Sequence, residues 1–205
     1  MRAKRPVPYP GFVLLMALSM GAAGWLTGQE AAPTPTPTAT KEQADDAAGF
    51  KEFSARVGGY MTLRKNVEKK LPAMKNKEQL PEMITAHQQA LARKIREARP
   101  HARSGNIFTP AAREAFRHAI RGAFQEAHTS TAHTVTRQRD NAAQVPLKVN
   151  GIYPDAVAET AFPPTLLQKL PTLPEELAYR IVGRDLVLVD SKANLVLDLL
   201  HEALP

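Results

Sequence analysis

The sequence predicts an α+β fold in which about three main helices are followed by a small antiparallel β-hairpin or three-stranded sheet packed on them. Apolar residues recur every three or four positions through much of residues 45–140, which is the period of an amphipathic helix. Residues 178–199 instead form short apolar runs, separated by turn-forming residues at 183–185 and 191–193. Because so small a sheet is not stable alone, its apolar face is expected to lie on the helices.

An amphipathic first helix is expected over about 25 residues and ends at Pro72. Its apolar positions are spaced by three or four and share one face: Phe50, Phe53, Val57, Tyr60, Leu63, Val67 and Leu71. Asp45 and Asp46 suit its N-terminus as capping residues and through the helix dipole. Gly58 and Gly59 fall in the middle, where they predict a kink or a close helix crossing.

Two further helices are expected before residue 128. The second lies within residues 76–100 and ends before Pro100. Its apolar face consists of Ile84, His87, Leu91 and Ile95. Thr109 and Pro110 suit the N-cap and first turn of the third helix. The inner face of the third helix consists of Ala112, Phe116, Ile120, Ala123 and Ala127.

The C-terminal region combines turn signals with short apolar runs. Asn150 and Gly151 lie between apolar residues, which is a strong signal for a two-residue β-hairpin. A short helix is expected near Pro164. Strands are expected near residues 178–182, 186–190 and 194–199. One face of the last strand should carry Leu195, Leu197 and Leu199, because alternate residues of a strand point the same way.

The N-terminus has the features of an export signal. Arg2, Lys4 and Arg5 form a positively charged start, and residues 11–28 follow without a charge. Residues 1–28 are therefore expected to be either a cleaved signal peptide or a retained membrane anchor, since about 20 apolar residues span a bilayer. Both alternatives predict an exported protein that is either periplasmic or secreted. If the segment is retained, residues 11–28 anchor the protein to the membrane.

Three segments are expected after the signal. Residues 29–44 are rich in Pro and Thr, which favours polyproline II and predicts a disordered linker. Residues 45–140 form a basic helical region, with 19 Lys+Arg against 11 Asp+Glu between 41 and 140. Residues 141–205 form an α+β region with 5 Lys+Arg against 8 Asp+Glu. The opposite net charges favour packing of the two regions as one domain.

Several classes of site are excluded or not expected. The chain has no cysteine, which excludes disulfides, thiolate metal sites and cysteine nucleophiles. It has no P-loop, no G-x-G-x-x-G and no G-x-S-x-G, so we assign no catalytic residue and no cofactor. Nucleic acid is not expected as a partner, because the basic segments lack interleaved aromatic residues and export removes the usual partners.

Basic side chains at helical spacing form candidate anion-binding sites. Arg113, Arg117 and Arg121 repeat every four residues on the third helix. A second basic group lies at the end of the second helix and consists of Arg93, Lys94, Arg96, Arg99 and Arg103. Of these, Arg93, Lys94 and Arg96 are the candidate anion-binding residues. The alternative interpretation is a solvated helix face in the first case, and in the second a helix C-terminus whose charges complement its dipole.

A metal site is a further hypothesis. Glu114 and His118 are four residues apart on the third helix, a spacing that can place two ligands on one face, and His128 lies further along. No H-E-x-x-H motif supports them. The alternative is a surface Glu–His pair.

Several stretches together resemble a family of exported bacterial proteins of uncharacterised function: LARKIREAR, GNIFTP, VNGIYP, PPTLLQKLPTLPEELAYRIVGRDLVLVDSKANLVLDLL and ALP. The resemblance covers most of residues 45–205 and implies no catalytic residue. The last 30 residues are also similar to the C-terminal hairpin of the nickel/cobalt-homeostasis periplasmic proteins, through a Pro-rich lead-in, one Tyr, a Gly turn and the run LVLVD. That similarity implies a role in metal homeostasis.

These observations lead to an expected function without a defined ligand. We expect a non-enzymatic exported protein of the cell envelope that binds a partner protein or an anionic polymer. The alternatives are a periplasmic metal-handling or stress protein and an envelope enzyme of a type without a recognisable motif.

Overall fold

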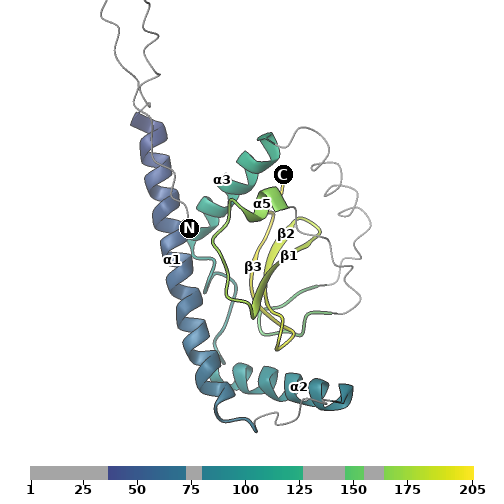
Figure 1. Cartoon of the computed structure of the whole chain (residues 1–205). Coiled ribbons are helices and arrows are strands. Elements are labelled where there is room, and N and C mark those ends of the chain that lie inside the picture. Colours follow the sequence, from purple (N-terminus) through teal and green to yellow (C-terminus); the bar gives the residue numbers. More distant parts are fainter. Residues whose placement is uncertain (1–36, 73–79, 127–145, 155–163) are drawn as a thin grey trace, which may run out of the picture. The chain divides into compact units, whose positions relative to one another are not determined.

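The computed structural model of the chain describes residues 37–72, 80–126, 146–154 and 164–205 (Figure 1). The elements are helices α1 (Pro37–Glu68), α2 (Pro81–Ala98), α3 (Pro110–Glu126) and α5 (Pro164–Leu167), followed by strands β1 (Leu177–Val182), β2 (Asp185–Asp190) and β3 (Leu195–Leu200). The predicted α+β fold is confirmed, because the helices precede a three-stranded antiparallel sheet in the order β1-β2-β3. The expected signal or anchor, residues 1–28, lies outside the described part. None of the described helices is long and apolar enough to cross a membrane.

Helix α1 begins at Pro37, earlier than the start predicted at Asp45 and Asp46 and within the segment expected as a linker. Proline is tolerated in a first helical turn, and Lys41, Glu42 and the alanines that follow are good helix formers. The predicted apolar face is confirmed over the rest of the helix. Phe53, Val57, Tyr60 and Val67 are buried, and Phe50, Leu63 and Leu71 pack at the margin of the core.

The close crossing of α1 with another helix lies at Gly49. A Cβ added to Gly49 would be 2.5 Å from the carbonyl oxygen of Ala111 and 2.9 Å from Cβ of Ala115 on α3. The crossing predicted at Gly58 and Gly59 is wrong, since a Cβ at either position meets no atom within 4 Å. Gly49 belongs to the face of α1 that packs on α3, whereas the other two glycines are exposed.

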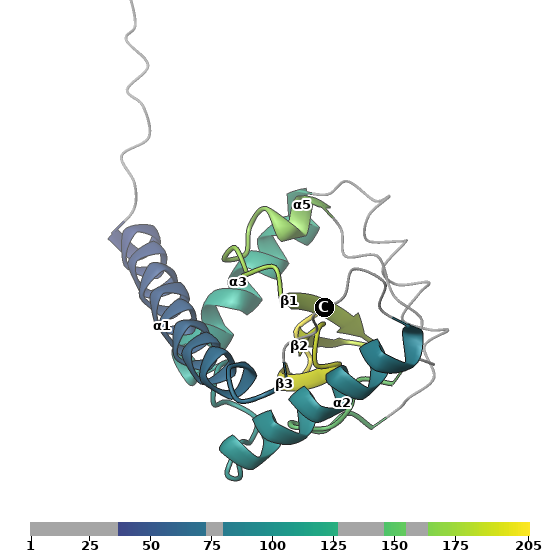
Figure 2. The same ribbon diagram turned by 60° about the horizontal axis from the view of Figure 1, so that its bottom comes forward.

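The sheet has two buried faces. The leucines of β2 face α1 and α3, and Phe53, Phe108 and Phe116 form the aromatic centre of this larger core. The valines of β2 face the opposite side, where they pack with Tyr153 and the segment before it. Helix α2 lies near the C-terminal end of α1 (Figures 1 and 2). The strands predicted from the sequence agree with those observed to within one residue.

A bulge in β3 changes which side chains share a face. The β2–β3 register shifts between Leu188, which is opposite Asp198, and Val189, which is opposite Val196. This leaves Leu197 as an extra residue in β3, as in a β-bulge. Leu199 therefore lies on the valine face and not with Leu195 and Leu197, so the predicted common face is wrong for Leu199.

The predicted hairpin at Asn150 and Gly151 is a turn that joins the edge of β3. Asn150 has a φ of 63°, and Gly151 N donates to the Lys148 carbonyl at 2.9 Å. The segment then pairs with β3, since Asn150 N donates to the Val196 carbonyl (2.8 Å) and Val196 N to the Gly151 carbonyl (2.9 Å). The hairpin prediction is wrong because the partner of this segment is distant in sequence and not the next strand.

Side chains that follow α2 cover the rest of the same edge. Arg99 Nη2 donates to the Leu197 carbonyl at 3.3 Å, and Ser104 Oγ donates to the Leu199 carbonyl at 3.1 Å. These outward backbone groups of β3 are therefore paired by two separate segments of the chain, residues 150–153 and the loop after α2.

Candidate functional site

Two carboxylates are fully buried on the helix-facing side of the sheet. Asp190 ends β2 and Asp198 follows the bulge in β3, and both have 0% of their surface exposed. Because burial of a charge is costly unless it is hydrogen-bonded or paired, their partners define how the sheet is joined to the helices.

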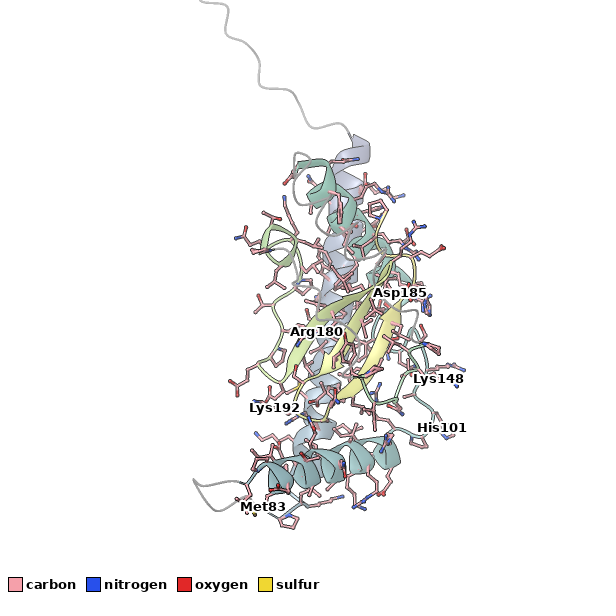
Figure 3. All side chains as sticks on the ribbon, turned by 90° about the vertical axis from the view of Figure 1, so that its right-hand side faces the viewer. Met83, His101, Lys148, Arg180, Asp185 and Lys192 are labelled. Carbon is pink, nitrogen blue, oxygen red and sulfur yellow. The ribbon has the colours of Figure 1, made fainter. Side chains whose placement is uncertain are left out.

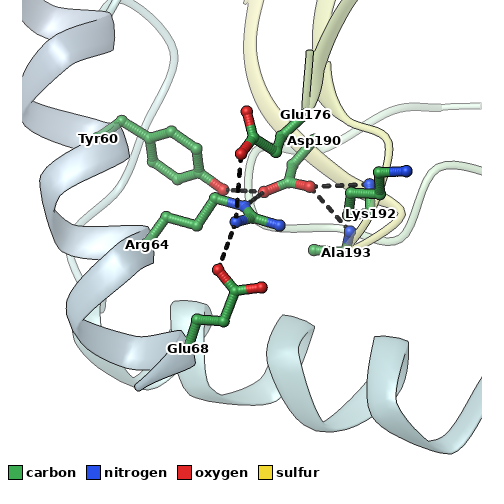
Figure 4. Close-up of polar contacts among 7 residues, drawn as sticks. All are labelled: Tyr60, Arg64, Glu68, Glu176, Asp190, Lys192 and Ala193. Atoms are coloured by element: carbon green, nitrogen blue, oxygen red, sulfur yellow. Dashed lines mark hydrogen bonds and ion pairs between the residues drawn. The ribbon is translucent and has the colours of Figure 1, made fainter. Parts of the chain in front are cut away.

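Asp190 is held by side chains of α1 and by the turn after β2 (Figure 4). Tyr60 Oη donates to Asp190 Oδ2 at 2.6 Å, and Arg64 Nε donates to the same oxygen at 2.9 Å. The backbone N–H groups of Lys192 and Ala193 donate to Oδ1 at 3.0 and 2.8 Å. Both oxygens therefore accept two hydrogen bonds, and a cation lies beside the carboxylate.

The charge states of this cluster follow from its geometry. Burial alone would lower the pKa of Arg64, but Asp190 and then Glu68 favour the cation and hold the pKa above its usual value. Arg64 Nη1 donates to Glu68 Oε2 at 2.8 Å and lies 3.9 Å from Glu176 Oε1. The pKa of Tyr60 is raised, chiefly by burial and then by the charge of Asp190. Tyr60 is thus a neutral donor and Arg64 a cation in the folded protein.

A cavity of about 440 Å³ lies beside the Asp190 cluster. Arg64 and Leu91 line it together with surface residues of α2 and of the loops around β1 and β2. Its carboxylates are Glu68, Glu175 and Glu176, and its fixed cations are Arg64 and Lys192. Since Asp190 already pairs with Arg64, the surroundings of the cavity carry an excess of negative charge.

The N-cap residue Leu80 and the first half of α2 extend this cavity with an exposed apolar surface. Leu80, Met83 and Ile84 are 62%, 48% and 47% exposed, and residues 81–86 are all exposed. Burial begins only at Leu91, and Ile95 follows it into the core. The apolar face predicted for this helix is therefore confirmed at Leu91 and Ile95 but uncovered at Ile84.

Asp198 is held by backbone groups. Gly105 N donates to Oδ1 at 2.9 Å, and Ile107 N and Phe108 N donate to Oδ2 at 2.6 and 2.8 Å. Leu199 N donates to Oδ1 at 2.8 Å. The carboxylate thus fixes the loop that leads into α3, where Thr109 Oγ1 accepts from Ala112 N at 3.4 Å as the predicted N-cap.

The predicted anion-binding arginines of α3 differ in role. Arg113 Nε donates to the Phe108 carbonyl at 2.9 Å. Arg117 Nη1 binds Glu114 at 3.0 Å, and Nη2 donates to the His201 carbonyl at 3.3 Å. Arg121 is exposed. Two of the three therefore support loops of the fold.

The predicted basic group of α2 lies on the surface of that helix. Arg93 and Lys94 are exposed and Arg96 is half-buried. Lys94 Nζ pairs with Glu97 at 2.7 Å. This group is on a separate helix from the arginines of α3.

The candidate metal ligands do not share a site in the described part of the chain. His118 Nδ1 lies 2.9 Å from Asp46 Oδ1 and 3.4 Å from Glu42 Oε1, both on α1. Glu114 instead pairs with Arg117, and His128 lies outside the described residues. Within those residues, no group of three His, Asp or Glu side chains could hold a metal ion.

The Asp190 cluster was missed from the sequence although a signal was present. Arg64 follows Tyr60 by four residues and precedes Val67 by three, so it falls in the row of buried positions of α1. Asp190 follows Leu186 and Leu188 at alternate positions, on the side of β2 that faces the helices. A charged residue in each of two buried rows indicates a buried pair.

Comparisons with known proteins give no match. No protein-family model matches the chain, and searches of curated proteins and of solved structures give no significant similarity. The family resemblances described above therefore stay predictions.

Proposed function

We propose that the chain is an exported, non-enzymatic protein of the cell envelope that binds a partner protein through the first half of α2. The observation that carries this proposal is the exposed apolar surface of Leu80, Met83 and Ile84. Isolated exposed apolar residues are normal. Exposed apolar residues that lie next to each other are typical of an interaction surface, and here they lie at the start of a helix whose second half packs into the core.

The cavity beside Ile84 indicates the chemistry of the partner. Ile84 lines both the apolar surface and the cavity that contains Glu68, Glu175 and Glu176. An amphipathic segment with apolar side chains and a neighbouring Lys or Arg matches both features, because its cation would enter the acidic cavity while the apolar residues cover α2. The partner we infer is therefore a protein with such a basic, apolar segment.

The N-terminal sequence supports the proposed location. A basic start followed by an uncharged stretch over residues 11–28 is typical of an exported protein. The partner is accordingly sought among envelope proteins.

Photocrosslinking of the full chain tests this proposal. A photoreactive amino acid at Met83 is expected to capture one envelope protein, and at the exposed Arg121 of α3 to capture none. Mass spectrometry of the crosslinked peptide should identify a segment with a Lys or Arg next to apolar residues. Ile84→Ser should abolish the crosslink while thermal melting stays unchanged.

Two results would refute the proposal. One is the same set of crosslinks from Met83 and from Arg121, which would indicate nonspecific contact. The other is a crosslinked segment rich in Asp and Glu, which the acidic cavity would repel.

A further inference from the structure

A second cavity, of about 450 Å³, lies between the middle of α1 and the loop that follows α2. The side chains that line it and can carry charge are Arg56, Arg99 and His101. Asn106 adds a polar side chain, Tyr60 contributes its ring, and no carboxylate of the described residues lines this cavity. Its electrostatic character is therefore opposite to that of the acidic cavity beside Asp190.

Arg99 is a partly buried cation with neutral partners. Its guanidinium lies over the Tyr60 ring, 5.3 Å from the centroid. Nη1 donates to Asn150 Oδ1 at 3.4 Å and Nη2 to the Leu197 carbonyl at 3.3 Å, both long distances for such bonds. Within the described part of the chain, Arg99 forms no ion pair, whereas Arg64 pairs directly with Asp190. The buried charge of Asp198 favours the Arg99 cation from a distance, but the oxygens of Asp198 are occupied by backbone N–H groups. A partly buried cation without a direct ion pair is stabilised by an anion that enters beside it.

The walls of the cavity leave room for such an anion. Gly59 lines it, and a Cβ at this position would meet no atom within 4 Å. Arg56 is exposed and its Nη2 lies 3.7 Å from Glu52, a loose surface pair that an anion can displace. His101 projects from the loop after α2, and Lys148 lies on a neighbouring segment (Figure 3). The C-terminal dipole of α2 disfavours an anion, so Arg56 and Arg99 must supply the attraction.

We propose that this cavity binds an oxyanion, a phosphate or carboxylate group, through Arg99, Arg56 and His101. Arg99 would give the oxyanion charge-assisted hydrogen bonds from a position fixed by Tyr60 and Asn150. The same chemistry is presented by free phosphate and by the repeating groups of an anionic polymer. This site shares no residue with the exposed surface of α2, so it is independent of the proposed protein partner.

Calorimetric titration of the full chain tests the proposal with four probes: inorganic phosphate, acetate, polyphosphate and polygalacturonate. Binding of phosphate or acetate alone would assign a free anion. Binding of a polymer alone would assign a polymer-borne group, and the choice between the two polymers would identify it as phosphate or carboxylate. Binding is expected to weaken as salt is added. No binding of any probe at low salt would overturn the proposal.

Variants place the binding in this cavity. Arg56→Gln and His101→Gln are each expected to weaken binding about tenfold, and Arg99→Gln more, because it removes the buried cation. The matched control is Arg93→Gln, which removes an exposed cation of α2 that does not line the cavity. Equal effects of Arg93→Gln and Arg56→Gln would overturn the proposal, since general surface charge would then explain binding. Met83→Ser should leave oxyanion binding unchanged whether or not α2 binds a partner protein.

Discussion

Asp190 and Asp198 project from the same face of the sheet and are both fully buried, yet their partners differ in kind. Asp190 joins the sheet to α1 through two side chains, Tyr60 and Arg64. Asp198 joins it to the loop before α3 through backbone N–H groups alone. A side-chain pair can be exchanged for apolar residues of similar size, whereas backbone donors stay in place when their acceptor is removed.

The largest expected effect is that of Asp198→Ala. The change leaves the N–H groups of Gly105, Ile107 and Phe108 without their acceptor, so we expect the free energy of unfolding to fall by about 4 kcal/mol. Equilibrium urea unfolding measures this loss. Asp198→Asn keeps one acceptor oxygen and should lose about half as much. An unchanged urea midpoint for Asp198→Ala would show that the loop does not depend on the carboxylate.

The next largest effect concerns Asp190, which pairs with a charged side chain, whereas Asp198 accepts from backbone N–H groups. Arg64→Met leaves the Asp190 carboxylate buried without its cation, and we expect a loss of about 3 kcal/mol. Asp190→Asn in the same chain removes the uncompensated charge. The double variant should therefore lose about 1–3 kcal/mol less free energy of unfolding than the two single variants lose together. A double-mutant cycle in urea measures this coupling. Strict additivity would show that the pair does not act as a unit.

Alkaline titration tests the tyrosine side of the Asp190 cluster. Burial raises the pKa of Tyr60 and of Tyr179 above the ordinary value of 10.0. The unfolded chain ionises first, so these groups stabilise the fold fully below about pH 10 and stability then falls by up to about 1.4 kcal/mol per pH unit for each tyrosine. The ultraviolet absorbance of the Tyr60 and Tyr179 phenolates should therefore rise at the same pH at which circular dichroism shows the chain to unfold. Tyr60→Phe should make the fall less steep, and ionisation of all four tyrosines without unfolding would contradict the expectation.

The smallest effect concerns the support of the Asp198 loop. Arg113 donates to the Phe108 carbonyl in that loop, so Arg113→Ala should lower the free energy of unfolding by about 1 kcal/mol. The exposed Arg121 is the matched control, and Arg121→Ala should change stability by less than about 0.5 kcal/mol. Thermal melting compares the two. Equal losses would assign the effect to helix charge and not to the loop.

Much of the fold could be predicted because it depends on local patterns. The spacing of Phe53, Val57 and Tyr60 predicts the buried face of α1, and Thr109 with Pro110 marks the start of α3. The turns at 183–185 and 191–193 predict the strands. The errors arose where a distant partner decides the structure. The edge of β3 recruits Asn150 and Gly151, and the bulge reverses the face of Leu199.

The candidate sites were less predictable for a physical reason. The sequence places Arg99 among several basic residues at the end of a helix, and only the fold shows that Tyr60 and Asn150 hold it in a cavity. Arg56 has no sequence feature that separates it from other surface arginines. A binding site built from α1 and a later loop is a property of tertiary packing, so residue spacing within one helix does not reveal it.

The pairing along the outer edge of β3 has a consequence for association between copies. An open strand edge presents a row of N–H and C=O groups on which a second chain can add a strand. Residues 150–153 occupy the first half of this edge, and the side chains of Arg99 and Ser104 occupy carbonyls of the second half. Edge-to-edge growth from β3 is therefore blocked in the folded protein, and this protection against aggregation depends on a turn that lies about 45 residues earlier in the chain.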